Sequence, residues 1–291
     1  MVSVFSMFAL PHNVTALPFV FAGDPLQTIS PTGFRWKSLT AAFHDELIRP
    51  LAGAAQLRLG ETELSYNYRS TRPIVRVSNL LQLWRRVWLE LDVKPQRAWH
   101  PDGDAQAPVL FVIGQNISAD EFAERTQNTT VIVPCELDEE VAYCQAQEAL
   151  RALVDEGGIS PTVQCPARAK GREFDRVVVY GFGDALPEVS LQPQDDDSRL
   201  RLEYHLNNLY VAVTRAKKEL FIVDTEEEYQ KLWARAASAQ AIEELLGALN
   251  DEEARDWANA VAALNLGSKA DAGAMGTGDA RTQAMEYERQ G

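Results

Sequence analysis

Four short segments of this 291-residue sequence hold polar side chains whose types and spacing suit nucleotide chemistry. In the first, an apolar run over residues 19–22 leads into Gly23 and Asp24, and Gln27 follows three residues later. A side-chain amide just past the end of a strand can orient a water molecule or a phosphate oxygen. Taken alone, this pattern is equally typical of a turn with an aspartate cap.

The second segment surrounds Arg69. Its guanidinium is a fork of donors that can reach a phosphate, and Tyr68 beside it offers an aromatic face for a base. Ser70 or Thr71 could cap the helix that Pro73 opens. The alternative is an ordinary surface arginine near a helix start, beside a packed tyrosine.

The third segment places Lys170 and Gly171 just before Glu173, and a strongly apolar strand follows. Glycine at position 171 would let a ligand or nucleic acid approach the backbone closely. The carboxylate of Glu173 could accept a hydrogen bond from a sugar hydroxyl. The alternative is a simple helical turn ahead of a buried strand.

The fourth segment, residues 206–223, predicts a helix that ends in Arg215, Lys217 and Lys218 and is followed by a buried strand. Basic residues in the last turn of a helix complement the helix dipole, which is sufficient to explain the lysines. The helix dipole does not explain the rest of the sequence of residues 206–223.

The elements that must position these residues alternate along the chain. Short apolar runs predict strands at 19–22, 109–113, 131–133, 177–181 and 220–223, and helical patterns cover 37–51, 73–91, 139–154 and 202–217. Such alternation is typical of a parallel sheet that is covered by helices on both faces. Because ligands of these folds bind at the carboxyl ends of the strands, we expect the chemistry in the loops that follow the strands.

In this order, the four segments resemble motifs III to VI of the superfamily 1 DNA helicases of the UvrD, Rep and PcrA type. The family forms of motifs IV, V and VI are N-Y-R-S, K-G-L-E-F and L-Y-V-A-x-T-R-A-K. The matching segments are Gly23–Ile29, Leu64–Ser70, Lys170–Asp175 and Leu209–Lys217. The resemblance covers residues 15 to 225. It implies an α/β fold with a RecA-like parallel sheet and flanking helices, which is the fold of the second motor domain of a P-loop NTPase-type helicase.

The resemblance also implies roles for individual residues at a site for ATP with Mg²⁺. Gln27 would sense the γ-phosphate, and Tyr68 would stack on adenine. Arg69 and Arg215 would act as paired arginine fingers that stabilise the phosphoryl-transfer transition state. Glu173 would hold the ribose.

The same resemblance places Gly171 at the nucleotide and Lys170 at the nucleic acid. Phe34, Arg35 and Trp36 lie where the family has an aromatic side chain that stacks on single-stranded bases. The partner would be single-stranded or partly duplex DNA.

Departures from the family pattern limit what the chain can do alone. The sequence contains no G-x-x-x-x-G-K-S/T loop, and Asp45–Glu46 lies after motif III, where it cannot be the family's magnesium-binding pair. Arg172 replaces a leucine, and Pro166-Ala167-Arg168 stands where the family has a histidine or threonine that faces nucleic acid.

We therefore expect the C-terminal part of an ATP-dependent DNA helicase, inactive by itself, whose other half is an N-terminal segment or a partner subunit. The alternative is a non-catalytic module, derived from the helicase fold, that binds nucleic acid or protein.

Composition sets outer bounds on these hypotheses. Lys and Arg total 28 against 42 Asp and Glu, a net charge of −14, which excludes a histone-like coating protein. The three cysteines and four histidines show no metal-binding spacing, so we expect reduced thiols, no metal ligands and an intracellular protein without a membrane span. The expected organisation is the end of a first RecA-like domain (1–56), a second RecA-like domain (57–225), an acidic helical extension (226–264) and a disordered tail (265–291).

Overall fold

The computed structural model describes residues 24, 27–29, 41, 45, 64–100, 106–126, 129–155, 158–159, 162–188, 190–268, 271, 273 and 275. The chain divides into two units, Met1–Leu64 and Ser65–Gly291. The helices and strands given below belong to the second unit. The strand predicted at 19–22 and most of the helix predicted at 37–51 lie outside the described residues.

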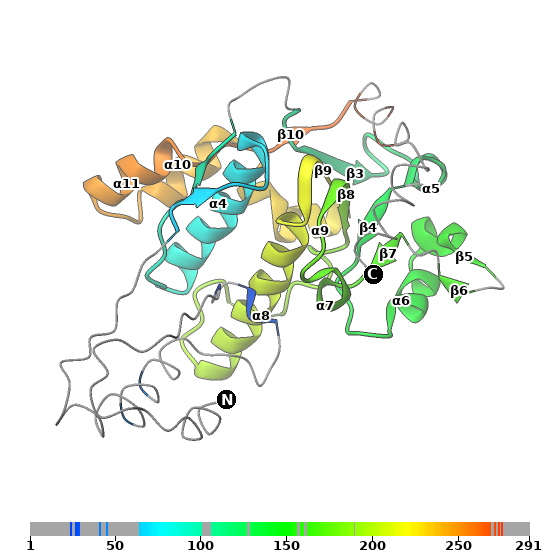
Figure 1. Ribbon diagram of the computed structural model, residues 1–291, viewed down its shortest axis with the longest axis horizontal. Helices are drawn as coiled ribbons and strands as arrows, with labels where there is room; N and C mark the ends of the chain where they lie inside the picture. Colours follow the sequence, from blue (N-terminus) through cyan, green and yellow to red (C-terminus); the bar gives the residue numbers. More distant parts are fainter. Residues whose placement is uncertain are drawn as a thin grey trace, which may run out of the picture. The chain divides into compact units, whose positions relative to one another are not determined.

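A six-stranded sheet runs through the second unit, and all of its strand pairs are parallel (Figure 1). The strand order is β10-β3-β9-β8-β4-β7. The strands are β3 (Val109–Ile113), β4 (Thr130–Ile132), β7 (Val163–Gln164), β8 (Phe174–Tyr180), β9 (Ala216–Thr225) and β10 (Asn265–Leu266). The predicted parallel α/β sheet is thus confirmed.

The apolar runs of the sequence locate the buried centres of the strands better than their ends. β3 has the predicted bounds, whereas β8 and β9 begin three and four residues earlier than the predicted 177 and 220. Their first residues include Asp175, Lys217 and Lys218, which are polar and only partly covered. Hydrophobicity cannot mark such strand ends, because their side chains reach solvent.

Alternating residues of the strands face opposite sides of the sheet. One face packs Phe111, Val131, Val178 and Phe221 into a core with Phe122. The residues between them, such as Leu110, Ile132, Val177 and Ile222, are also buried, so the sheet is covered on both faces.

Helices supply both covering layers (Figure 1). On one side lie α4 (Arg72–Trp88) and α8 (Asp196–Val213), which contact each other and the strand β9. On the other side lie α5 (Ala119–Thr126), α6 (Glu140–Ala146) and the 3₁₀ helix η3 (Glu148–Leu153). The prediction of one continuous helix over 139–154 is wrong. Gln147 takes an extended conformation and separates α6 from η3.

The end of α8 also differs from the prediction. The helix ends at Val213, and Lys217 and Lys218 belong to β9 instead of the last helical turn. The Thr214 N–H still donates to the carbonyl oxygen of Tyr210 at 3.0 Å, and from Ala216 onward the chain pairs with β8.

Short helices follow β9 in the C-terminal region. They are α9 (Glu226–Lys231), η4 (Trp233–Arg235), α10 (Ala239–Leu246) and α11 (Asp251–Ala258). Ser238 and Asn250 cap the last two by accepting hydrogen bonds from backbone N–H groups. The first two residues of the segment expected to be disordered form β10 beside β3. Among the described residues, no helix is long and apolar enough to cross a bilayer.

Shorter elements complete the unit. β1 (Tyr66–Asn67) pairs in parallel with β2 (Arg97–Ala98), and β5 (Val154–Asp155) pairs in antiparallel with β6 (Gly158–Ile159). The single-turn helix α7 (Pro166–Ala169) precedes β8. The second segment includes β1 and the turn before α4, and the third segment lies between α7 and the start of β8.

Candidate nucleotide site

The third and fourth segments meet at the amino ends of β8 and β9. Phe174 pairs with Ala216 across the two strands, and the Phe174 N–H donates to the carbonyl oxygen of Arg215 at 2.9 Å. Because the strands are parallel neighbours, Glu173 and Arg215 enter the sheet at the same edge. The expectation that these residues follow strands at their carboxyl ends is therefore wrong, since the motifs lie in the connections that lead into β8 and β9.

The second segment is fastened to the same edge by hydrogen bonds. The Ser70 hydroxyl donates to the carbonyl oxygen of Ala216 at 2.8 Å, and the Thr71 N–H donates to that of Lys217 at 3.0 Å. The side-chain oxygen of Asn67 accepts from the N–H groups of Arg69 and Ser70, both at 3.0 Å. These contacts fix the turn between β1 and α4, and they place Arg69 beside the start of β9.

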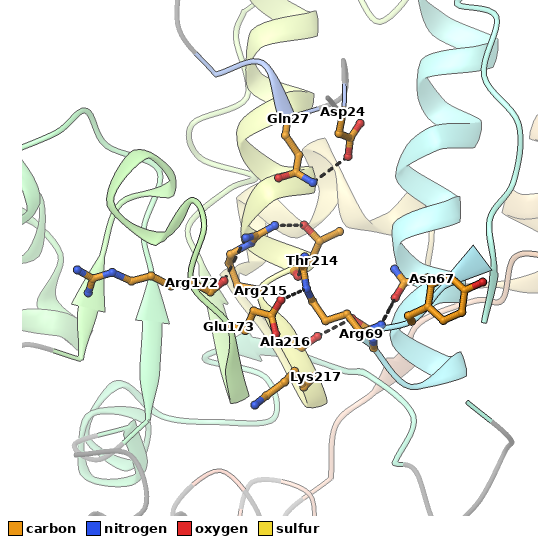
Figure 2. Close-up of polar contacts among 12 residues, drawn as sticks. Asp24, Gln27, Asn67, Arg69, Arg172, Glu173, Thr214, Arg215, Ala216 and Lys217 are labelled. Carbon is orange, nitrogen blue, oxygen red and sulfur yellow. Dashed lines mark hydrogen bonds and ion pairs between the residues drawn. The ribbon is translucent and has the colours of Figure 1, made fainter. Parts of the chain in front are cut away.

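Arg69 and Glu173 form an ion pair across 104 residues of sequence (Figure 2). Arg69 Nη1 also donates to the carbonyl oxygen of Thr214 at 3.4 Å. The side chains of Arg69 and Glu173 are 33% and 39% exposed. An ion pair this accessible to solvent contributes only about 0–1 kcal/mol to stability. Both groups can therefore exchange this partner for a ligand at little cost.

Arg215 is held very differently, because it is only 1% exposed. Its Nε donates to the carbonyl oxygen of Val211 at 3.0 Å, and its Nη1 donates to that of Arg172 at 3.1 Å. Its Nη2 donates to the Thr214 hydroxyl, also at 3.1 Å (Figure 2). The guanidinium thus ties the end of α8 to the approach to β8.

Asp175 binds the two lysines of the fourth segment. Its carboxylate contacts Lys217 Nζ at 3.1 Å and also pairs with Lys218 Nζ. Partial burial alone would raise the pKa of Asp175, but hydrogen bonds from Lys218 and Lys217 lower it below the usual value. The lysines therefore join β9 to β8 and do not serve as helix-terminal charges.

Tyr68 belongs to an exposed aromatic cluster that the sequence analysis did not identify. Its ring lies 5.0 Å from that of Trp99 and 6.3 Å from that of Tyr66, measured between centroids. Tyr68 and Trp99 are 56% and 59% exposed. Trp99 comes into place because its N–H donates to the carbonyl oxygen of Asn67, next to the parallel pair of β1 and β2. No local signal links Trp99 to Tyr68, since 30 residues separate them.

Gly171 and Lys170 lie in the turn between α7 and β8. Gly171 has φ = +85°, in the left-handed region that favours glycine, and no heavy atom lies within 4 Å of the position a Cβ would take. The backbone conformation thus accounts for this glycine. Lys170 is exposed, and its N–H donates to the carbonyl oxygen of Pro166.

Arg168, the last residue of the Pro166-Ala167-Arg168 stretch, is bound to acidic side chains. It donates to Glu140 and to Asp138, each at 2.7 Å. Burial alone would raise the pKa of Glu140, but several hydrogen bonds, the strongest of them from Arg168, together lower it below the usual value. These ion pairs hold the Arg168 guanidinium against Asp138 and Glu140.

In the first unit, the Gln27 amide donates to the Asp24 carboxylate at 2.8 Å, and the Gln27 N–H donates to the Asp24 carbonyl oxygen at 3.1 Å (Figure 2). Phe34 and Trp36 lie outside the described residues. Within the described ranges, no group of three or more His, Cys, Asp or Glu side chains is arranged to hold a metal ion.

Comparison with known proteins finds a family match over part of the chain. Residues 167–227 match the model of the UvrD-like helicase C-terminal domain, which covers motifs V and VI. A solved structure of the C-terminal domain of a possible DNA helicase from Lactobacillus plantarum WCFS1 is 24% identical to the chain. That match covers 55% of this chain and 88% of the other, with a TM-score of 0.29. No curated protein matches the chain. The resemblance to the C-terminal part of UvrD-like helicases is thus confirmed by the family match over this segment.

Proposed function

Because residues 167–227 match the UvrD-like helicase C-terminal domain, we propose that the chain supplies one side of the ATP site of such a helicase. One observation carries this proposal: three segments far apart in the sequence bring Arg69, Glu173 and Arg215 to a single edge of the sheet. A domain that served only as a scaffold would not require the accessible ion pair between Arg69 and Glu173.

The exposed residues of this edge fit parts of a nucleoside triphosphate. Tyr68 offers a solvent-accessible ring for the base, and Glu173 offers a carboxylate for the ribose hydroxyls. Arg69 can turn from Glu173 to a phosphate, because its present ion pair is weak. Arg215 would act at the γ-phosphate only if its side chain left its backbone partners, and Gln27 would sense that phosphate.

The fit covers one side of the nucleotide only. The sequence lacks a phosphate-binding loop with its lysine, so that loop must come from outside residues 1–291, in a longer chain or a separate subunit. When bound, ATP with Mg²⁺ would supply the phosphoryl group and the metal charge. We propose that this chain alone does not hydrolyse ATP.

DNA contact is part of the same proposal. Phe34 and Trp36 would stack on single-stranded bases and Lys170 would contact the backbone. The domain organisation given above, a fragment of a first motor domain followed by a second one, belongs to the proposal as well.

Nucleotide binding tests the proposal with a matched pair of variants. Arg69→Ala removes the ion pair with Glu173, and Arg86→Ala removes the pair between Arg86 and Glu253 on α4 and α11, which is similarly exposed. We expect Arg69→Ala to weaken binding of a fluorescent ATP analogue at least fivefold, because a charge-assisted phosphate contact is lost. Arg86→Ala should leave binding unchanged. Equal effects of the two variants would contradict the proposal.

Phosphate release by the purified chain with ATP and single-stranded DNA tests the proposal that this chain alone does not hydrolyse ATP. We expect no turnover. Turnover that Arg215→Ala leaves unchanged indicates a contaminating enzyme, whereas turnover that this change abolishes contradicts the claim that the chain is inactive alone.

The non-catalytic module remains the second candidate, and the burial of Arg215 favours it. Because this guanidinium binds the carbonyl oxygens of Val211 and Arg172, it has a structural role that does not require a nucleotide. A chain that is folded but binds no nucleoside triphosphate, even at millimolar concentration, would support the module.

A further inference from the structure

A pocket of about 150 Å³ lies at the carboxyl ends of β8 and β9, at the opposite edge of the sheet from the candidate nucleotide site. Tyr180 and Gly181 line it from the end of β8, and Asp224 and Thr225 line it from the end of β9. The carboxyl edge of a parallel sheet is the usual ligand-binding edge of such folds. The helicase segments of the second unit leave this edge unused.

Asp224 brings to this pocket a buried carboxylate of which only one oxygen is hydrogen bonded. The residue is 2% exposed, and the Gly183 N–H and Trp233 Nε1 both donate to its Oδ2, each at 2.7 Å. Its Oδ1 accepts no hydrogen bond from the described residues, yet it keeps accessible surface, so a ligand atom in the pocket can reach it. Because buried polar atoms are nearly always paired, Oδ1 indicates a place for a ligand that donates a hydrogen bond.

Two more carboxylates face the same pocket without a positively charged partner. Asp184 follows β8, and Glu228 lies on α9. Within the described part of the chain, no Lys, Arg or His forms an ion pair with either of them or with Asp224, and Lys231 pairs with Glu227 at 3.0 Å instead. Burial raises the pKa of Asp224 to about 7 against the lowering effect of its hydrogen bonds, and repulsion from Glu228 and Asp184 adds to the rise. The pocket therefore favours a positively charged ligand.

The geometry also indicates the kind of cation. Among the described residues, these carboxylates are not arranged to ligate a metal ion. An ammonium group differs from a metal ion in carrying several N–H donors, which can reach oxygens that are spread around it. Gln147 and Thr225 add side-chain oxygens to the wall. The pocket is too small for a drug-sized ligand, which needs roughly 300–1,000 Å³, but it has room for an ammonium group on a short alkyl chain.

We propose that this pocket binds an alkylammonium group, which donates hydrogen bonds to Asp224 Oδ1 and to the carboxylates of Glu228 and Asp184. The group can belong to a free polyamine or to a lysine side chain of a protein. This site is independent of the proposed ATP site, because it uses neither Arg69 nor Tyr68.

Titration of the full chain with n-butylammonium chloride, at constant ionic strength, tests the proposal. The backbone amide of Gly183 reports binding by NMR, because its N–H donates to Asp224 Oδ2. We expect its signal to shift with a dissociation constant on the order of 1–10 mM, as befits a small fragment. Tetramethylammonium is the matched control ligand, since it has the same charge but no N–H donor, and it should bind at least about tenfold more weakly.

Variants of the acidic residues separate a specific contact from a general effect of charge. Asp224→Asn removes the charge but keeps an oxygen for the two existing hydrogen bonds, and it should weaken binding of n-butylammonium about tenfold or more. Glu228→Gln should weaken binding severalfold, which keeps the proposal testable if Asp224→Asn does not fold. Glu226→Gln removes one charge from the same helix, and it should leave binding unchanged because Glu226 does not line the pocket.

Asp224 should also make the binding depend on pH. With a pKa of about 7, its ionised fraction rises about tenfold between pH 6 and pH 8, whereas the alkylammonium group stays charged. The other ionisable groups that face Asp224 are Asp184, Glu228, Tyr143 and Tyr180, and burial raises the pKa of both tyrosines. The affinity of the native chain should therefore rise about tenfold from pH 6 to pH 8, and that of Asp224→Asn should stay level.

Two further ligands identify the source of the ammonium group. Tighter binding of Nα-acetyl-lysine amide than of 1,4-diaminobutane assigns the pocket to a lysine of a protein, and equal or weaker binding assigns it to a free polyamine. The proposal is overturned if n-butylammonium causes no shift up to about tenfold above the expected constant, if tetramethylammonium binds as tightly, or if Asp224→Asn binds as well as the native chain. None of these results bears on ATP binding at Arg69, so the two proposals can fail separately.

Discussion

Arg215 and Arg69 should respond very differently to replacement by alanine. Arg215→Ala removes a buried guanidinium that donates to two backbone carbonyl oxygens and one hydroxyl. A hydrogen bond from a charged donor contributes about 1.5–3 kcal/mol, and a buried carbonyl left unpaired costs about 1–3 kcal/mol. Relief from burying a charge offsets part of this loss. We therefore expect the free energy of unfolding to fall by about 3 kcal/mol.

Arg69→Ala removes a half-exposed ion pair with Glu173 and one long contact to the carbonyl oxygen of Thr214. Its effect on the free energy of unfolding should be below about 1 kcal/mol. We therefore expect the two variants to differ by about 2 kcal/mol or more in the free energy of unfolding. The helicase resemblance assigns one common role to the two arginines.

Urea unfolding, followed by circular dichroism, measures this difference. With a denaturant dependence of about 2 kcal/mol/M, Arg215→Ala should move the midpoint down by about 1.5 M, and Arg69→Ala should move it by less than about 0.5 M. Arg215→Lys should lie between them, because lysine keeps the charge but lacks the planar fork of donors. Equal midpoints for the two alanine variants would refute the structural role of Arg215. If the difference is found, only Arg215→Lys, checked to be folded, can report on a catalytic role.

Three further predictions concern other parts of the second unit. Burial raises the pKa of Asp224 to about 7 from 3.8, so the folded state loses up to about 4 kcal/mol of stability as the pH rises from 4 to 8. Asp224→Asn keeps one side-chain oxygen, which can still accept the hydrogen bonds from the Gly183 N–H and from Trp233 Nε1. In urea unfolding, this variant should be more stable than the native chain at pH 8 but not at pH 4. A difference in stability between the two proteins that does not change with pH would contradict this prediction. Gly181→Ala should lower the free energy of unfolding by about 2 kcal/mol or more, because φ of Gly181 is +75° and the new Cβ would lie 2.2 Å from Tyr143 Oη. The double variant with Tyr143→Phe should recover part of that loss in the same assay, and no recovery would exclude the contact as its cause. Trp99→Ala should change stability by less than about 1 kcal/mol, since the side chain is mostly exposed, yet weaken the binding of a fluorescent ATP analogue severalfold; unchanged binding would exclude a contribution of Trp99 to the platform around Tyr68.

The sequence by itself determined the kind of fold, because the information needed for it is local. Apolar runs such as 109–113 mark strands buried on both faces, and their alternation with helical patterns requires a parallel sheet. The segments around Arg69, Glu173 and Arg215 could also be recognised in the sequence, and the family match over residues 167–227 agrees with the two around Glu173 and Arg215.

Only the tertiary structure decided where these residues lie and how they are held. Periodicity does not state at which end of a strand a segment lies, and the connections placed Glu173 and Arg215 at the amino ends of β8 and β9. Periodicity also does not predict whether a charged residue is buried. The burial of Arg215 and the partial exposure of Arg69 could therefore not be predicted. The position of Trp99 beside Tyr68 likewise depends on contacts between residues far apart in the chain. Such contacts exist only once the sheet has brought its strands into register.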